Sequence, residues 1–187
     1  MRSLPPRLLL LLPLVGACAS NPGSLDAGPP PPGPARADAD LPGAVELMNF
    51  MILGPGVAGA GQPAVEDFSE LAKQGYSTVI NLRKPGEAFP EDEAARAAAA
   101  GLVYAALPMR VADFGIEEAA ALHKILEAAP EGSVLIHCGS GNRVGALWGM
   151  YLGLRDGLSP EDAVEAGQRA GMHSPELADR IRMSLRG

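Results

Sequence analysis

The stretch Ser133-Val134-Leu135-Ile136-His137-Cys138-Gly139-Ser140-Gly141-Asn142-Arg143 decides the fold, because it joins a strand to a helix around one cysteine. Residues 133–137 are short, apolar and rich in β-branched side chains, which is typical of a buried strand. Residues 144–154 predict the helix that follows. A thiol between the carboxyl end of a strand and the amino terminus of a helix meets the positive end of the helix dipole, which favours the thiolate.

The rest of the chain from residue 44 alternates between apolar segments and glycine or proline. Two more strands are predicted, over residues 77–82 and 102–107. Residues 47–53 predict either an edge strand or a helical turn, and residues 56–61 are only a small-residue stretch. Helices are predicted over residues 63–73, 91–100, 115–128 and 144–154, after the N-cap Ser159, and over residues 175–185.

This order of elements predicts the fold class. Strands that alternate with helices form a mainly parallel central sheet, which helices cover on both faces. The sequence therefore predicts a three-layer α/β domain over residues 44–187.

Residues 1–17 have the pattern of a bacterial export signal. Arg2 and Arg7 form a short basic region, and the apolar run over residues 8–15 is shorter than the roughly 20 residues that a spanning helix needs. The sequence Val15-Gly16-Ala17-Cys18 resembles a lipobox, which implies cleavage before Cys18 and lipidation of its sulfur. The alternative is an ordinary secretory signal with an incidental cysteine.

Residues 18–43 are rich in Pro, Gly and Ala and have almost no large apolar side chains, which predicts a disordered linker. The three parts together predict a protein of the bacterial cell envelope, at the outer membrane or the periplasmic face. The lipid anchor would be its only contact with the membrane.

The charge and the residue types exclude several kinds of partner. The chain has 15 basic and 22 acidic residues, a formal net charge of −7, which becomes −9 without residues 1–17. So acidic a domain argues against nucleic acid as a partner and against a polybasic membrane patch. Three scattered histidines form no metal pattern and no cofactor motif is present, so neither a metal nor a cofactor is expected.

The segment after the strand has the parts of an anion-binding site. Gly139, Ser140, Gly141 and Asn142 have small or short side chains, so their backbone N–H groups can converge on an oxyanion. Arg143 adds a planar guanidinium that suits phosphate or another oxyanion. The expected partner is therefore a phosphorylated substrate or another oxyanion.

The alternative for this segment is a plain strand-to-helix corner with an inert buried cysteine. Two observations argue against it. Arg143 has no structural reason to follow such a loop, and a lipidated Cys18 would leave Cys138 as the only free thiol of an exported protein. The lack of a second thiol also argues against a dithiol oxidoreductase.

The loop is similar to the signature His-Cys-x-x-Gly-x-x-Arg of tyrosine and dual-specificity phosphatases, with the arginine one position earlier. The chain more closely resembles the beta-lactamase hydrolase-like protein, phosphatase-like domain family. That family shares the Gly61-Gln62-Pro63 turn, the Val79-Ile80-Asn81-Leu82-Arg83 strand and the shortened loop. The resemblance covers about residues 45–172. It implies a cysteine-phosphatase-like fold with Cys138 as the nucleophile and His137 as a residue that orients the loop.

Two departures from the phosphatase pattern favour a second chemistry. The shorter spacing from Cys138 to Arg143 also occurs in rhodanese loops, whose smaller cradle suits a persulfide sulfur. Val144 stands where phosphatases carry a hydroxyl that helps the thiolate to leave. Sulfur transfer, the activity described for several members of the family, is therefore the main alternative.

A phosphatase also needs an acid that protonates the leaving oxygen. Asp113 follows a predicted strand, where the resemblance to dual-specificity enzymes places that acid, but it could equally be an N-cap. Arg83 and Arg110 could extend the anion pocket or be solvated charges.

The sequence thus predicts a cysteine-dependent phosphatase-like hydrolase with a Cys138 phospho-enzyme intermediate. A rhodanese-like sulfurtransferase that uses a Cys138 persulfide is the alternative. A weakly active, anion-binding envelope lipoprotein is the third hypothesis.

Overall fold

The computed structural model describes residues 46–87, 92–112 and 114–187. Five strands form one sheet in the order β1-β2-β5-β3-β4. The pairs β2–β5, β5–β3 and β3–β4 are parallel, and β1 runs antiparallel to β2 at one edge. The strands are β1 (Met51–Gly54), β2 (Val57–Ala60), β3 (Tyr76–Asn81), β4 (Val103–Ala106) and β5 (Ser133–His137). The expected signal peptide, linker and Cys18 lie outside the described residues.

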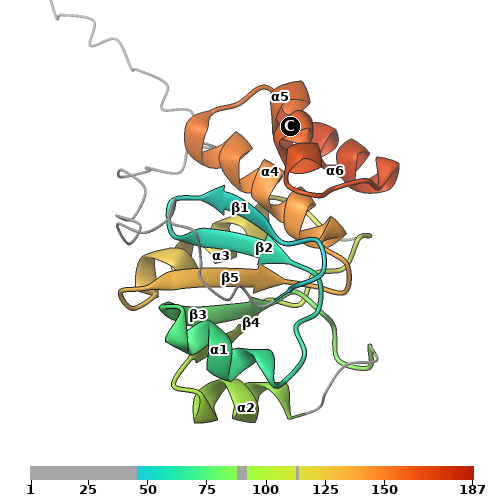
Figure 1. The fold of residues 1–187 in the computed structure, drawn as a ribbon. Helices are drawn as coiled ribbons and strands as arrows, with labels where there is room; N and C mark the ends of the chain where they lie inside the picture. The colour runs from blue at the N-terminus through green and yellow to red at the C-terminus, as the bar shows by residue number, and fades with distance from the viewer. Residues whose placement is uncertain (1–45, 88–91, 113) are drawn as a thin grey trace, which may run out of the picture.

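Six helices surround the sheet, and Figure 1 shows α5 and α6 stacked beyond α4, away from α1 and α2. Because the hydrophobic side chains form one core on each face of the sheet, the three-layer α/β prediction is confirmed. No helix within the described residues has both the length and the apolar composition needed to cross a membrane. The helices are α1 (Asp67–Lys73), α2 (Glu93–Ala99), α3 (Ile116–Ala128), α4 (Asn142–Asp156), α5 (Pro160–Arg169) and α6 (Pro175–Arg186).

The two cores follow from the alternation of side chains along each strand. In β5, Leu135 faces the core beneath α1 and α2, whereas Val134 and Ile136 face the core beneath α3 and α4. The central strand is thus apolar on both faces, as expected for a parallel sheet that helices cover on both sides.

Most predicted strands are confirmed, but one inner strand is missed. Residues 133–137 match β5, and the segment 47–53 contains an edge strand rather than a helical turn. The small-residue stretch 56–61 contains β2, which pairs directly with β5. Small residues are needed there because a Cβ at Gly59 would lie 2.7 Å from Cγ1 of Val144 in α4. Because residues 57–60 are mostly small, this segment lacks the bulky β-branched side chains by which strands are recognised in a sequence.

The predicted start of the first helix at Pro63 is wrong. The helix begins at Asp67, after a turn in which the Ala64 N–H donates to Oδ2 of Asp67 at 2.8 Å. Pro63 is held in place instead by Gln62, whose Nε2 donates to the Pro63 carbonyl at 3.1 Å. The other helices begin and end close to their predicted bounds, and Ser159 caps α5 as expected.

Helix α4 is the central helix of the domain and is fixed on both sides. It lies between the sheet and α5, where a Cβ at Gly149 would come within 2.4 Å of the Ala163 carbonyl oxygen. Because such glycines allow the two helix backbones to approach closely, α4 is held at a fixed position. Its amino terminus, which follows Cys138, is therefore rigidly placed.

Candidate active site

Cys138 lies at the point where β5 ends and the loop to α4 begins. Its side chain is 1% exposed, and it is a free cysteine. The N–H of Gly141 donates to Sγ of Cys138 at 3.1 Å. Gly141 has a φ of +86°, in the left-handed region that glycine adopts without strain, so this turn depends on glycine. The loop thus directs a backbone donor at the sulfur.

The loop is supported from outside by the segment that follows β2. Gly61 forms a bridge with Ser140, and the N–H of Gln62 donates to the Gly139 carbonyl at 3.3 Å. A Cβ at Gly61 would lie 3.1 Å from that same carbonyl oxygen, closer than most side chains tolerate. A side chain at Gly61 would therefore require the loop or Met48 to shift by a few tenths of an ångström.

Asn142 supports the loop from the other side. Its Oδ1 accepts hydrogen bonds from the N–H groups of His173 and Ser174, at 2.8 and 3.1 Å. The side-chain oxygen of Asn142 thus ties the start of α4 to the segment between α5 and α6. This leaves the backbone N–H of Asn142, in the first helical turn, as the group that an anion could use.

Arg143 extends from the first turn of α4 to the loop after β3. Its Nη1 and Nη2 donate to the two carboxylate oxygens of Glu87, both at 2.7 Å. Nη1 also lies 3.3 Å from the Leu82 carbonyl and 3.4 Å from the Met109 carbonyl. Arg143 therefore contacts the segments that follow β3 and β4. This two-point pairing with Glu87 fixes the plane of the guanidinium beside the loop.

The charges of this pair stabilise each other. The hydrogen bond from Arg143 is the main reason why the pKa of Glu87 is lowered from 4.5 to about 2. The same bond, together with the proximity of Cys138, raises the pKa of Arg143. Arg83 adds a second positive charge, with its Nε 3.5 Å from Oε2 of Glu87. Arg83, which the sequence left as a solvated charge or a pocket residue, is thus a partly buried neighbour of Glu87.

We expect Glu87→Gln to lower the free energy of unfolding at pH 7 by about 1.5 to 3 kcal/mol, because the charge-assisted pair with Arg143 is lost. The folded pKa of Glu87 lies below its ordinary value, so the contribution is complete above pH 4.5 and disappears as the pH falls through about 2. Urea unfolding of both proteins between pH 7 and pH 3 measures the difference. Glu131→Gln, at an exposed position before β5, is the control. A difference that stays constant down to pH 3 would count against the pairing.

A buried polar cluster lies beneath the loop, around Glu93. This first residue of α2 is 1% exposed, and its carboxylate accepts from Gln62 Nε2 at 2.9 Å, Asn81 Nδ2 at 2.6 Å and the Tyr104 hydroxyl at 3.2 Å. Burial raises the pKa of Glu93, and these donors act in the opposite direction. The cluster joins α2 and the loop after β2 to the carboxyl end of β3 and to β4.

His137 adjoins this cluster and is fully buried. Its Nε2 lies 3.2 Å from Oε1 of Glu93, without the geometry of a hydrogen bond. Burial is the main cause that lowers the pKa of His137 to about 3, and the charges of Arg83 and Arg143 act in the same direction. His137 is therefore neutral at physiological pH. A neutral, enclosed ring fits a residue that shapes the loop better than one that transfers protons.

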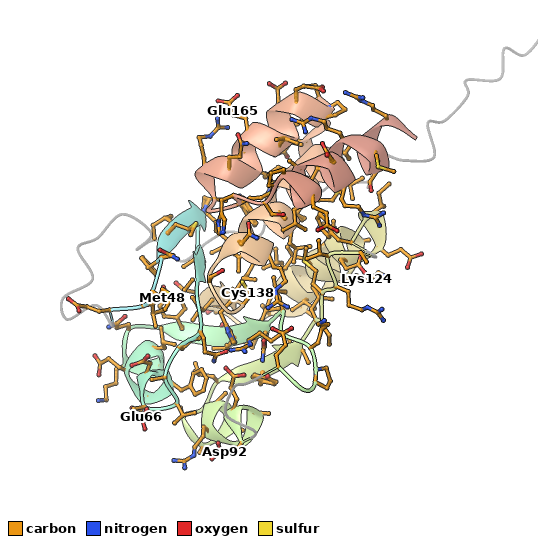
Figure 2. The ribbon with its side chains drawn as sticks, turned by 90° about the vertical axis from the view of Figure 1, so that its right-hand side faces the viewer. Met48, Glu66, Asp92, Lys124, Cys138 and Glu165 are labelled. Atoms are coloured by element: carbon orange, nitrogen blue, oxygen red, sulfur yellow. The ribbon has the colours of Figure 1, made fainter. Side chains whose placement is uncertain are left out.

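These residues surround a pocket that opens above the sulfur of Cys138. Of the predicted site residues, the structure brings Cys138, Gly139, Ser140, Asn142 and Arg143 to its wall, whereas the predicted Gly141 is not among the residues that line it. Figure 2 shows Cys138 at the centre of the domain, between the sheet and the helices above it. In the described ranges, no group of three or more His, Cys, Asp or Glu side chains could hold a metal ion. The pocket is completed by Lys84, Glu87, Met109 and Val111.

Two site predictions concern Asp113, which lies outside the described residues. Its proposed role as an acid is therefore not tested by the structure. The N-cap position of α3, its alternative role, is occupied by Gly115 instead. The N–H of Gly115 donates to Oε2 of Glu118 at 2.9 Å.

Sequence reasoning missed the pocket residues Lys84 and Glu87. Both belong to Lys84-Pro85-Gly86-Glu87, a turn at the carboxyl end of a predicted strand. Since ligands of parallel sheets bind at that edge, the charged turn was a usable signal.

Comparison with known proteins assigns the family. Residues 49–154, more than half of the chain, match the family described as "Beta-lactamase hydrolase-like protein, phosphatase-like domain". The chain belongs to this family. The match lies within the range 45–172 that the motifs suggested and contains the Cys138 loop, the Glu87 turn and most of α4.

Curated members of the family are longer proteins. The chain is 36% identical over 123 residues to the beta-lactamase hydrolase-like protein of Xylella fastidiosa strain 9a5c, covering 64% of this chain and 28% of that protein. The corresponding protein of Agrobacterium fabrum is 34% identical over 119 residues, covering 60% and 27%. The chain thus spans little more than a quarter of these relatives.

Solved structures share the family's fold at lower identity. TpbA of P. aeruginosa in complex with pTyr has a TM-score of 0.59 and 23% identity, covering 75% of this chain and 84% of that one. The core catalytic domain of a PP-IP phosphatase from S. cerevisiae has a TM-score of 0.61 and 19% identity, covering 74% and 86%. At these identities the comparison shows the fold, which is that of phosphatases.

Proposed function

We propose that the protein is a cysteine-dependent phosphatase of the tyrosine and dual-specificity type, acting on a phosphate ester. The observation that carries this proposal is the geometry at Cys138. Its sulfur accepts the Gly141 N–H at 3.1 Å, and the guanidinium of Arg143 lines the same pocket. The site therefore offers a nucleophile and an oxyanion cradle to one ligand.

In the first step the Cys138 thiolate attacks phosphorus and the ester P–O bond breaks. The three phosphoryl oxygens bind the N–H groups of the loop and the donors of Arg143 that Glu87 does not occupy. The leaving oxygen takes a proton from an acid. In the second step water attacks the phospho-enzyme, the S–P bond breaks, and inorganic phosphate and the Cys138 thiolate are released.

We assign the acid of the first step to Asp113, which comes directly before the buried Phe114 and two residues after the pocket residue Val111. Asp113→Asn should lower kcat for an alkyl phosphate by about 10²-fold, because its leaving oxygen needs a proton. An aryl phosphate with a good leaving group should react nearly as before. Rates of both substrates against pH test this, and equal losses for the two would remove Asp113 from this role.

Sulfur transfer is the second candidate, and one observation favours it. Val144, directly after Arg143, is fully buried and apolar, so this position supplies no hydroxyl to help the thiolate leave. In that reaction the Cys138 thiolate would attack the outer sulfur of thiosulfate. The S–S bond of thiosulfate would break, leaving sulfite and a Cys138 persulfide.

One pair of assays separates the candidates on the same preparation of the full chain. Phosphate release from an aryl phosphate without sulfite release from thiosulfate supports the phosphatase. The reverse result supports the sulfurtransferase. Neither activity, with tight binding of inorganic phosphate or vanadate, would indicate an anion-binding protein.

The cellular setting is also part of the proposal. A lipid on Cys18 and a linker over residues 18–43 would hold the domain at the bacterial envelope, so its substrate would be exported or periplasmic. The acidic composition of the chain supports a phosphorylated small molecule or protein as the partner rather than nucleic acid.

A further inference from the structure

Asn49 is the one non-glycine residue with a positive φ among residues 46–87, 92–112 and 114–187, at +50°. It lies just before β1 and is exposed to solvent. Asparagine tolerates this left-handed conformation better than most residues, but the conformation still costs free energy. In this turn, a contact made by the Asn49 side chain offsets that cost.

That contact reaches the active-site loop. Nδ2 of Asn49 donates to the carbonyl oxygen of Ser140 at 2.9 Å, across 91 positions of sequence. The backbone next to Asn49 is anchored as well, since the Gly61 N–H donates to the Met48 carbonyl at 2.7 Å. Figure 2 shows Met48 beside the region of Cys138. The turn that carries Asn49 therefore lies against the outside of the loop.

The carbonyl that Asn49 holds belongs to the peptide unit whose N–H contacts the nucleophile. In the Ser140–Gly141 peptide, the oxygen accepts from Asn49 and the nitrogen donates to Sγ of Cys138 at 3.1 Å. A trans peptide is planar, and its C=O and N–H point in opposite directions. A group that fixes the oxygen on one side therefore fixes the N–H on the other.

We propose that Asn49 is a positioning residue of the active site, which holds the Ser140–Gly141 peptide so that the Gly141 N–H points at the sulfur of Cys138. The hydrogen bond from Gly141 stabilises the thiolate, which accepts it more strongly than the thiol does. Asn49 thereby favours the nucleophilic form without touching it. The role of Asn49 in catalysis rests on the proposed function, whereas its effect on the Cys138 thiolate can be tested without a substrate.

Other charged groups also face the sulfur, and the Asn49 variants leave them in place. Arg143 approaches from α4, and Lys84 and Glu87 line the pocket from the loop after β3, whereas the neutral His137 of β5 faces Glu93. None of these side chains has a hydrogen bond to Asn49 among the described contacts. A change in the reactivity of Cys138 when Asn49 is replaced can therefore be attributed to the loss of the Asn49 amide.

The test is the rate of alkylation of Cys138 by iodoacetamide against pH, followed by mass spectrometry on the peptide that contains Cys138. Asn49→Gly removes the amide and keeps a residue that adopts a positive φ, whereas Asn49→Ala removes the amide and adds strain. Met48→Ala, which keeps the backbone and Cβ beside Asn49, is the matched control. Thermal unfolding of all four proteins runs in parallel.

We expect the midpoint of the alkylation profile to rise by about 0.5 to 1 pH unit in both Asn49 variants and to stay unchanged in Met48→Ala. The melting temperature should fall further in Asn49→Ala than in Asn49→Gly. A midpoint that rises equally in the two Asn49 variants, although their stabilities differ, would show that the amide controls the thiolate and that the stability of the turn does not.

An unchanged midpoint in Asn49→Gly overturns the inference, whatever the activity of the protein. A shift that follows the loss of stability instead, large in Asn49→Ala and absent in Asn49→Gly, also overturns it. Alkylation needs no substrate, so a raised midpoint with no phosphate release would support the inference while contradicting the proposed function.

Discussion

Cys138→Ser should lower phosphate release by at least about 10³-fold, because a serine hydroxyl at this position is not ionised and no neighbouring base takes its proton. Two described residues near the sulfur could in principle accept that proton. The ring of His137 faces Glu93 instead, and the carboxylate of Glu87 is paired with Arg143. Initial rates with an aryl phosphate measure the loss.

This variant separates catalysis from binding. Serine is similar in size to cysteine, and its oxygen can still accept the Gly141 N–H, so the cradle should persist. Inorganic phosphate should therefore bind to Cys138→Ser with an affinity close to that of the wild type, as calorimetry can measure. Phosphate release that survives in a folded Cys138→Ser protein would show that the activity arises elsewhere.

Arg143→Lys should lower kcat/KM by about 10²- to 10³-fold, although the charge is retained. A lysine is a point charge without the planar fork, so it cannot bind Glu87 at two points and present further donors to a phosphoryl group. Vanadate, which resembles the transition state of phosphoryl transfer in shape, should lose affinity more strongly than phosphate does.

Arg155→Lys is the matched control because it changes an arginine of the same helix. Arg155 also pairs with a carboxylate, that of Asp156, but at the far end of α4 and over the ring of Tyr151. Its replacement should leave kcat/KM near the wild-type value. Equal losses in the two lysine variants would mean that Arg143 acts through the stability of α4 and not at the phosphoryl group.

The segment from Ser133 to Arg143 was predictable because its information is local. A short apolar run defined the strand, and small residues, a cysteine and an arginine followed within a few positions. The predicted strand matches β5, and the loop and helix follow as expected. The fold class was predictable from the alternation of strands and helices along the chain. The apolar strand over residues 133–137 agreed with it, since an inner parallel strand is apolar on both faces.

What the sequence could not provide depends on contacts between distant residues. Strand β2 was missed because Gly59 must be small to let Val144 approach, so close packing removed the usual signal. The helix predicted at Pro63 begins later because Gln62 and Pro63 are held beside the site. No local pattern shows that Glu93 is buried.

The same limit applies to Glu87 and Asn49, which contact the loop from distant turns. Glu87 pairs with Arg143 across 56 positions, and Asn49 contacts Ser140 across 91. Each is a polar residue in a turn, and on its own it reads as a solvated side chain. Only the folded sheet brings these turns to one edge.

The central claim is that Cys138 becomes phosphorylated during turnover. The most direct measurement is mass spectrometry of the protein quenched in acid within milliseconds of mixing with an aryl phosphate, with the modified peptide sequenced. The account predicts the added mass of one phosphoryl group on the peptide that contains Cys138, and its absence in Cys138→Ser. Turnover of the substrate with no phosphoryl group on Cys138 at any quench time would contradict the account.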